Sequence, residues 1–335
     1  MEIYAAGYMP WPTSKIEPVR KSRIHPRESL RVQLFRLVPY SSRHGSILLV
    51  FVCRPSHFTV LRFTRITSSH SSKAQFPSTV RVIPVDYNSI PELTTALNNQ
   101  DAIISTLTTA AADVQHTLID AAITAGVKRF IPSEFGADTG NPNASTLPVY
   151  QSKIAVNKAL QAKAAENPSF TYTLIRHGPF LDWGLNAGFF FDWRSEAPTF
   201  YDGGDRPFST TTLATIGQAV VGVLLHFDET KNRPVYIHDL VTSQRQIYTI
   251  VQKLAPQRKW NPVDVSTAEL EVKAREEWAK GNTDLRSIVG LLCRAVFAEG
   301  YGGEFKNVDN ELLGLGFKTE ADLEEVVKTI LGDSL

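Results

Sequence analysis

The sequence lacks the features of several large protein classes. Its two cysteines, Cys53 and Cys293, are too few for a disulfide framework and form no metal-binding spacing. Lysine and arginine total 35 against 34 aspartate and glutamate, so the formal net charge of +1 gives no electrostatic basis for binding nucleic acid or an anionic membrane. The longest apolar run, Ser46–Cys53, is far shorter than the roughly 20 residues that span a bilayer. We therefore expect neither a nucleic-acid nor a membrane partner.

Signal and catalytic motifs are also missing. The N-terminus has no basic segment followed by an apolar one, which argues against a secretory signal and predicts a cytoplasmic location. No G-x-S-x-G turn supports a serine hydrolase triad. The histidines show no metal-ligand spacing, so no metal site is predicted; those considered are His116, His177 and His238.

What the sequence does contain is an alternation of strand and helix patterns. This alternation predicts an α/β fold with a Rossmann-type, doubly wound parallel sheet. Strands are expected at 31–38, 58–65, 80–85, 101–105, 128–132, 170–176 and 234–237, and helices from Ser89 and over 110–126, 149–165 and 210–227. The apolar run that begins at Ser46 fits a buried strand or a helix turn equally well, because periodicity does not separate the two in so short a segment.

The domain organisation follows from this pattern. Residues 1–30 contain four prolines among basic and small residues, which predicts a disordered extension; a solvated tail is favoured over an interaction arm or a targeting peptide. Residues 31–180 are predicted to form an NAD(P)-binding domain, to which 205–240 add a helix and a strand. Residues 181–204 and 241–335 are predicted to form a smaller, mainly helical substrate lobe.

A candidate site lies where the loop 132–147 leaves the carboxyl end of a strand, the edge at which ligands bind in open parallel sheets. Lys153, on the helix that follows, can orient a cofactor ribose or take part in proton transfer, although a solvated surface lysine is the commoner case. Ser133 can bind a cofactor or cap a turn, and Phe135 can pack on a flat ring or in the core. Glu134 is more typical of a cap or salt bridge than of a catalytic acid.

Two further segments bear on the ligands. Arg65 lies about 20 residues after Gly45, where an arginine favours the 2′-phosphate of NADP, although a surface arginine fits as well. The aromatic-rich stretch 180–193 can line a pocket for an aromatic substrate. Simple core packing is the favoured interpretation, because aromatic side chains dominate buried area.

The block from Val80 to Gly184 resembles the NmrA-like family of atypical short-chain dehydrogenases, and in particular its isoflavone reductase-like branch in fungi. The resemblance is carried by D-A-I-I-S at 101–105, A-G-V-K-R-F-I-P-S-E-F-G at 125–136, Lys153 and I-R-H-G-P-F at 175–180. It continues more loosely over most of residues 57–330.

The resemblance implies an NADPH-dependent oxidoreductase that transfers a hydride to a small, possibly aromatic compound. It implies Lys153 as catalytic residue, Phe135 as the residue that packs on the nicotinamide and Arg65 as the 2′-phosphate contact. The expected cofactor-binding set is Gly45, Arg65, Thr106, Ser133, Phe135 and Lys153, and the expected substrate contacts are Phe180 and Trp183. Tyr150 stands one residue too close to Lys153 for the Tyr-x-x-x-Lys of typical short-chain dehydrogenases and is not expected to be their acid.

The N-terminal part departs from the family pattern. Relatives begin with a strand that leads into G-x-x-G-x-x-G, whose backbone approaches the pyrophosphate. If Gly45 is the last of these glycines, Pro39 and Ser42 occupy the first two positions, where side chains take up the space of the phosphates. This departure indicates either an error in the reading frame or splicing over about the first 55 residues or a diverged paralogue. It also keeps open a dinucleotide-sensing regulatory protein or a pseudoenzyme.

Overall fold

The computed structural model describes residues 46–53, 60–68, 81–108 and 111–332. The strand expected at 31–38 and the extension expected at 1–30 lie outside these residues. Within the described part of the chain, no helix is long and apolar enough to cross a membrane.

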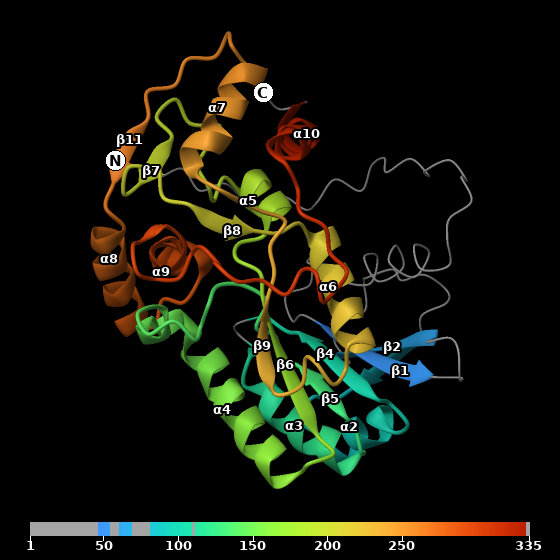
Figure 1. The fold of residues 1–335 in the computed structure, drawn as a ribbon. Helices are drawn as coiled ribbons and strands as arrows, with labels where there is room; N and C mark the ends of the chain where they lie inside the picture. The colour runs from blue at the N-terminus through green and yellow to red at the C-terminus, as the bar shows by residue number, and fades with distance from the viewer. Residues whose placement is uncertain (1–45, 54–59, 69–80, 109–110, 333–335) are drawn as a thin grey trace, which may run out of the picture.

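The central element is a seven-stranded sheet in the order β3-β2-β1-β4-β5-β6-β9 (Figure 1). Its strands are β1 (Ser46–Cys53), β2 (Val60–Ser68), β3 (Arg81–Val85), β4 (Ala102–Thr106), β5 (Arg129–Ile131), β6 (Thr171–Arg176) and β9 (Arg233–Tyr236). Every strand except β1 runs in the same direction. The predicted parallel sheet is therefore confirmed for these six strands.

Helices cover both faces of the sheet, which confirms the doubly wound architecture. One face carries α2 (Ile90–Leu97), α3 (Val114–Thr124) and α4 (Gln151–Glu166), and the other carries α6 (Leu213–Leu225). Because successive residues of a strand point to opposite faces, Ile103 and Phe130 pack with the first group and Ile104 with α6.

Strand β1 is the exception, because it is antiparallel to both of its neighbours, β2 and β4. It begins beside the carboxyl end of β4, where Ser46 pairs with Thr106, and it ends at the opposite edge of the sheet. Only residues 54–59 separate β1 from β2, whereas a parallel crossover requires a dozen residues or more. The structure describes no helix between these strands, and so short a connection leaves no room for the βα turn that binds pyrophosphate in Rossmann folds.

The buried arginine of the motif at 125–136 is structural. Arg129 is fully buried and donates hydrogen bonds of 2.8 Å to the hydroxyls of both Thr171 and Thr173, 3.0 Å to that of Thr230, and a further one to the carbonyl of Phe227. Burial lowers the pKa of its guanidinium to about 10. These bonds tie β5 to β6 and to the segment after α6.

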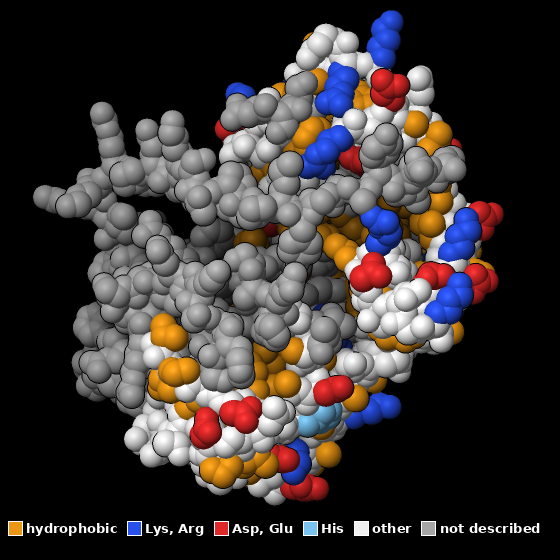
Figure 2. All heavy atoms as spheres, turned by 180° about the vertical axis from the view of Figure 1, so that it is seen from behind, with side chains coloured by type: hydrophobic (Ala, Val, Ile, Leu, Met, Phe, Trp, Pro, Cys, Tyr) orange, Lys and Arg blue, Asp and Glu red, His pale blue; other side chains and the backbone are white. Residues whose placement is uncertain are grey.

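The smaller elements lie together beyond the carboxyl ends of the parallel strands (Figure 1). They comprise α5 (Leu181–Ala187), α7 (Gln244–Leu254), α8 (Thr267–Ala279), α9 (Leu285–Phe297), α10 (Glu320–Leu331) and two short sheets, β7 (Thr199–Tyr201) with β11 (Val263–Val265) and β8 (Phe208–Thr210) with β10 (Leu240–Thr242). Their core is aromatic: the rings of both Phe190 and Phe297 lie 5.3 Å from that of Phe208. On the face shown in Figure 2, charged side chains of both signs are interspersed.

The turn after β6 depends on a glycine. Gly178 has a positive φ of 70°, and a β-carbon there would overlap the backbone oxygen of Ser209. Gly203 also has a positive φ, of 86°, but a β-carbon there would meet nothing within 4 Å. A side chain at Gly203 would meet only the conformational cost of a positive φ, whereas a side chain at Gly178 would meet that cost and a steric overlap as well.

We predict that Gly178→Ala lowers the free energy of unfolding by more than about 3 kcal/mol, because it adds overlap with backbone to the cost of a positive φ. Gly203→Ala carries the conformational cost alone, about 1–2 kcal/mol. Urea denaturation followed by tryptophan fluorescence measures both values, and equal losses would contradict the packing described for Gly178.

Candidate active site

The segments that follow β5 and β6 form one layer at the carboxyl edge of the sheet. Gly136 bridges to Arg176 in parallel register, and its carbonyl oxygen accepts hydrogen bonds from the backbone N–H groups of His177 (3.1 Å) and Gly178 (3.0 Å). The loop after β5 and the turn after β6 are therefore held together by backbone contacts.

A buried ion-pair network lies beneath this layer. Arg176, 5% exposed, donates to Asp138 Oδ1 at 2.6 Å and to Thr139 Oγ1 at 3.1 Å, and its Nε lies 3.5 Å from Glu134 Oε1. Glu134, 1% exposed, also accepts hydrogen bonds from Thr139 and, at 3.1 Å, from Asn157. Glu134 is thus a salt-bridge carboxylate, the role that its sequence context favoured.

Lys153 faces the same layer from the first turn of α4. Its ammonium donates a hydrogen bond to the backbone oxygen of Glu134, and a β-carbon on Gly136 would lie 3.8 Å from Nζ. Burial lowers the pKa of Lys153, and the carboxylate of Glu134 partly offsets this effect. The neighbouring Lys158 is exposed, and Lys163 pairs with Asp120 at the surface, so that Lys153 alone among the lysines of α4 points into the layer.

His177 packs against two aromatic rings in the same layer. Its ring is fully buried, 4.5 Å from that of Phe180 and 6.2 Å from that of Phe135, measured between centroids. Neither ring nitrogen has a well-aligned hydrogen-bond partner in the described part of the chain, although the backbone groups of His177 and Gly178 interact with the ring and act to raise its pKa. Burial lowers the pKa of His177 to about 3, and the positive charge of Lys153 acts in the same direction. The imidazole is therefore neutral at physiological pH.

Ser133 ties strand ends together. Its hydroxyl lies 2.8 Å from that of Ser105 and accepts a hydrogen bond from the backbone N–H of Leu107 at 2.8 Å. Its own N–H donates to the side chain of Gln115 at 2.8 Å. These bonds join β4, β5 and α3. Thr106, the last residue of β4, is partly buried at the same edge, and cofactor contacts by Ser133 and Thr106 remain predictions.

The aromatic stretch 180–193 divides into two parts. Phe189, Phe190, Phe191 and Trp193 are buried in the aromatic core, as the favoured interpretation predicted. Phe180 and Trp183 are partly buried, but they point to different neighbours: Phe180 packs on His177, whereas the Trp183 ring lies 5.8 Å from that of Phe189. Phe180 and Phe135 therefore share His177 as a neighbour.

Tyr150 does not share the helix face of Lys153. It ends a short 3₁₀ turn, Pro148–Tyr150, one residue before α4 begins, and its ring is buried. Burial raises the pKa of its hydroxyl, and the nearby groups of Glu134 and Cys293 raise it further. Its hydroxyl is therefore a poor proton donor, in agreement with the sequence-based expectation.

The phosphate end of the expected site is less fully described. Gly45 lies outside the described residues. Arg65 lies in β2, and the strand continues three residues beyond it to Ser68, so Arg65 does not end the strand as the sequence pattern indicated. Its backbone is placed between Leu48 of β1 and Val82 of β3.

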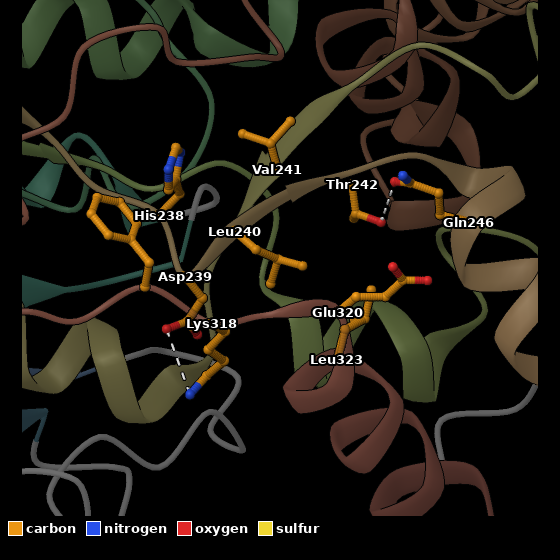
Figure 3. Close-up of a pocket in the computed structure, with 10 residues that line it drawn as sticks. His238, Asp239, Leu240, Val241, Thr242, Gln246, Lys318, Glu320 and Leu323 are labelled. Carbon is orange, nitrogen blue, oxygen red and sulfur yellow. Dashed lines mark hydrogen bonds and ion pairs between the residues drawn. The ribbon is translucent and has the colours of Figure 1, made fainter.

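A cavity of about 250 Å³ lies away from Lys153, between β10, α7 and α10 (Figure 3). His238, Thr242, Gln246 and Lys318 are among its lining residues, and none of the residues predicted for the site takes part. Two of its lining residues, His238 and Asp239, follow the carboxyl end of β9, which is the neighbour of β6 in the sheet.

The sequence-based analysis missed Arg176 and the isolation of His177. Both stand in the segment I-R-H-G-P-F that was singled out, directly after an all-buried strand. An arginine at the end of such a strand indicates a buried ion pair, because a buried charge requires a partner. The sequence does not show which carboxylate that partner is.

Comparisons with known proteins agree with this geometry. The sequence profile of the NmrA-like family matches residues 43–258, more than half of the chain, and the match begins before residue 57, where the looser resemblance was expected to begin. Oxidoreductase aprR of Aspergillus flavus is 37% identical over 277 residues, which cover 81% of this chain and 91% of that protein.

Two solved structures share the fold. A crystal structure of isoflavone reductase superposes with a TM-score of 0.60 at 17% identity, covering 78% of this chain and 89% of that one. A structure described as AtPrR2 with NADP⁺ and (+)pinoresinol gives a TM-score of 0.59 at 19% identity, covering 75% and 82%.

We predict that Arg176→Met lowers the free energy of unfolding by about 3–5 kcal/mol, because it removes the buried cation that pairs with the carboxylates of both Glu134 and Asp138. Lys128→Met is the matched control: Lys128 pairs with Asp101 at 2.7 Å, but its side chain is 62% exposed. Its loss should change stability by less than about 1 kcal/mol. Denaturant titration of both variants tests the difference, and comparable losses would contradict the role given to Arg176.

Proposed function

The chain belongs to the NmrA-like family, and we propose that it is an NADPH-dependent oxidoreductase of the isoflavone reductase-like type that reduces a small, possibly aromatic substrate. The observation that carries this proposal is Lys153, partly buried and held by the backbone of Glu134 beside Phe135 at the carboxyl edge of the sheet. Oxidoreductase aprR is the relative that supports the class of activity, and the AtPrR2 structure with NADP⁺ supports the cofactor.

The residues present suit the nicotinamide end of such a cofactor. Bound NADPH supplies a hydride, which this chain's own residues do not. Phe135 offers a partly exposed aromatic face for packing. Lys153 Nζ holds protons that it can deliver to a substrate oxygen as negative charge develops there, and its lowered pKa makes that delivery easier. The carbonyl oxygen of Glu134 orients Nζ without taking part in proton transfer.

The described residues suit the pyrophosphate end of NADPH less well than the nicotinamide end. A pyrophosphate in a Rossmann fold sits on the N-terminus of the helix after the first strand, and β1 is here joined to β2 by residues 54–59 alone. We propose that Gly45 and Arg65 contribute contacts, because the chain enters β1 at the carboxyl edge, where Ser46 pairs with Thr106.

A second candidate function follows from the same observation. A chain whose first strand is reversed can retain the nicotinamide edge and yet bind dinucleotide weakly or not at all. The reversal of β1 therefore favours, as alternative, a dinucleotide-sensing regulatory protein or a pseudoenzyme.

Domain limits and location are part of the proposal. We propose an NAD(P)-binding domain over 31–180, completed by 205–240, with a substrate lobe over 181–204 and 241–335. One hydrophobic cluster that lies wholly within the first part supports this division, although Leu313 and Leu315 of the second part pack with α6. A cytoplasmic location is supported by Cys293, which is free and buried.

We predict that NADPH binds with measurable affinity and that Arg65→Ala weakens NADPH binding about tenfold more than NADH binding, the value of a charge-assisted hydrogen bond. Isothermal titration calorimetry of both nucleotides measures this. No heat of binding at millimolar NADPH would exclude the reductase and favour the pseudoenzyme. An unchanged preference in Arg65→Ala would refute the 2′-phosphate contact alone.

We predict that Lys153→Met lowers kcat by about 10²- to 10⁴-fold, the contribution of a positioned proton donor, with little change in the Kd for NADPH. Turnover is followed by NADPH oxidation with the aromatic carbonyl compound, from a panel, that the wild-type chain reduces fastest. Lys158→Met, exposed on the same helix, serves as control and should keep wild-type turnover. Equal losses of turnover and NADPH affinity in Lys153→Met would indicate a binding role only.

A further inference from the structure

The cavity between β10, α7 and α10 is separate from the candidate active site and has a volume of about 250 Å³ (Figure 3). This volume is just below the range of about 300–1,000 Å³ that is typical of pockets for drug-sized ligands, so the cavity suits a smaller molecule. Leu240 and Leu323 are buried lining residues, whereas Val241 and Phe317 are exposed ones. Apolar surface therefore extends from the protein interior to the solvent, which favours a ligand with an apolar body.

Two of the three charged side chains that line the cavity compensate each other. Asp239 is buried, and its carboxylate accepts hydrogen bonds of 2.7 Å from both the N–H and the hydroxyl of Thr212 and of 2.6 Å from the hydroxyl of Thr215. Lys318 Nζ lies 3.8 Å from Asp239 Oδ1, so its positive charge is balanced within the chain. His238 adds no charge at neutral pH, because burial lowers its pKa.

Glu320 is the charged lining residue that remains. Its carboxylate has no hydrogen-bond or ion-pair partner among the residues that the structure describes. It is the first residue of α10, but the start of this helix is already capped, because Thr319 and Asp322 form a reciprocal capping box. In Figure 3 the Glu320 carboxylate and the Lys318 ammonium lie on opposite sides of the cavity. The cavity thus presents one uncompensated negative charge beside apolar surface.

We propose that this cavity binds a small organic ammonium ion, with the cation paired to Glu320 and the apolar body packed against the leucine side chains and Phe317. An ionised carboxylate only accepts hydrogen bonds, and an ammonium group only donates them. The exposed ring of Phe317 adds attraction to a cation through its face. A ligand carboxylate is disfavoured, because it would be repelled by Glu320 and would find Lys318 already paired. The site lies away from Lys153 and goes beyond the proposed function.

The test uses three probes that share a phenylethyl body. They are 2-phenylethylamine, which is protonated at neutral pH, the uncharged 2-phenylethanol and the anionic 3-phenylpropionate. Equilibrium dialysis against the full chain measures the dissociation constant of each. We expect the amine to bind about fivefold more tightly than the alcohol, the upper value for a solvent-exposed ion pair, and the carboxylate to bind most weakly. The ratio of amine to alcohol reports the charge, because the two head groups are similar in size.

Variants then assign this preference to one carboxylate. Glu320→Gln removes the charge and keeps the shape, so it should abolish the preference for the amine while leaving the affinity for 2-phenylethanol unchanged. Glu325→Gln is the matched control, because Glu325 is exposed on the same helix but does not line the cavity. It should keep the wild-type ratio.

A second pair of variants locates the binding. Val241→Trp places a large ring in the cavity and should abolish binding of all three probes, whereas Val272→Trp, at an exposed position on α8, should leave binding intact. Phe317→Ala provides a further check if Val241→Trp does not fold: it shortens an exposed side chain and should weaken binding of the amine and the alcohol alike.

Three results would overturn the inference. These are an amine preference that survives Glu320→Gln, tighter binding of the carboxylate than of the amine, and binding that neither Val241→Trp nor Phe317→Ala affects. Failure of 2-phenylethylamine to bind the wild-type chain at millimolar concentration would overturn it as well. Because no measurement involves NADPH, a failure of the proposed reductase function would leave this result unaffected.

Discussion

The buried pairing of Arg176 with Glu134 is the interaction on which the candidate site depends. It joins the loop after β5 to the end of β6, and both side chains are almost completely removed from water. Charges buried in this way are tolerated only while both partners stay in place, so the pair fixes the spacing of the two segments. Glu134 also holds Lys153 through its backbone oxygen. One residue therefore organises the network below the site and orients the lysine that faces it.

The two basic groups above this network have opposite environments. Lys153 has a backbone acceptor and an anionic neighbour, whereas the ring of His177 packs against Phe135 and Phe180. Burial disfavours the charged form of each group, and repulsion between them adds to this effect at His177, the weaker base. The layer consequently contains one group that can release a proton and one that can only exchange hydrogen bonds.

Most of the fold could be predicted from the sequence because its signals are local. Ser89 caps α2 through the N–H of Glu92, and α3 ends just before Gly126, whose φ is positive. Lys153 and Phe135 were singled out because they match a family motif, and their roles in a site stay predictions. The pairing of Arg176 and the isolation of His177 were not predictable, since both depend on contacts between residues far apart in sequence. Spacing along one strand or helix carries no information about them.

The first strand is a segment whose structure and direction could not be predicted from local sequence patterns. Residues 47–53 are wholly apolar and include three β-branched residues and one phenylalanine, which suits a strand buried on both faces as well as a helix turn. The slot between β2 and β4 decides the matter, because the interior of a sheet must be hydrogen-bonded on both sides. Because this segment forms an antiparallel strand between β2 and β4, it does not form the helix that follows a glycine loop in Rossmann folds. The chain thus retains a lysine at the carboxyl edge of the sheet while its first strand departs from the geometry that binds pyrophosphate. Cofactor affinity, rather than the chemistry at Lys153, is therefore the property by which a reductase and a pseudoenzyme of this fold differ.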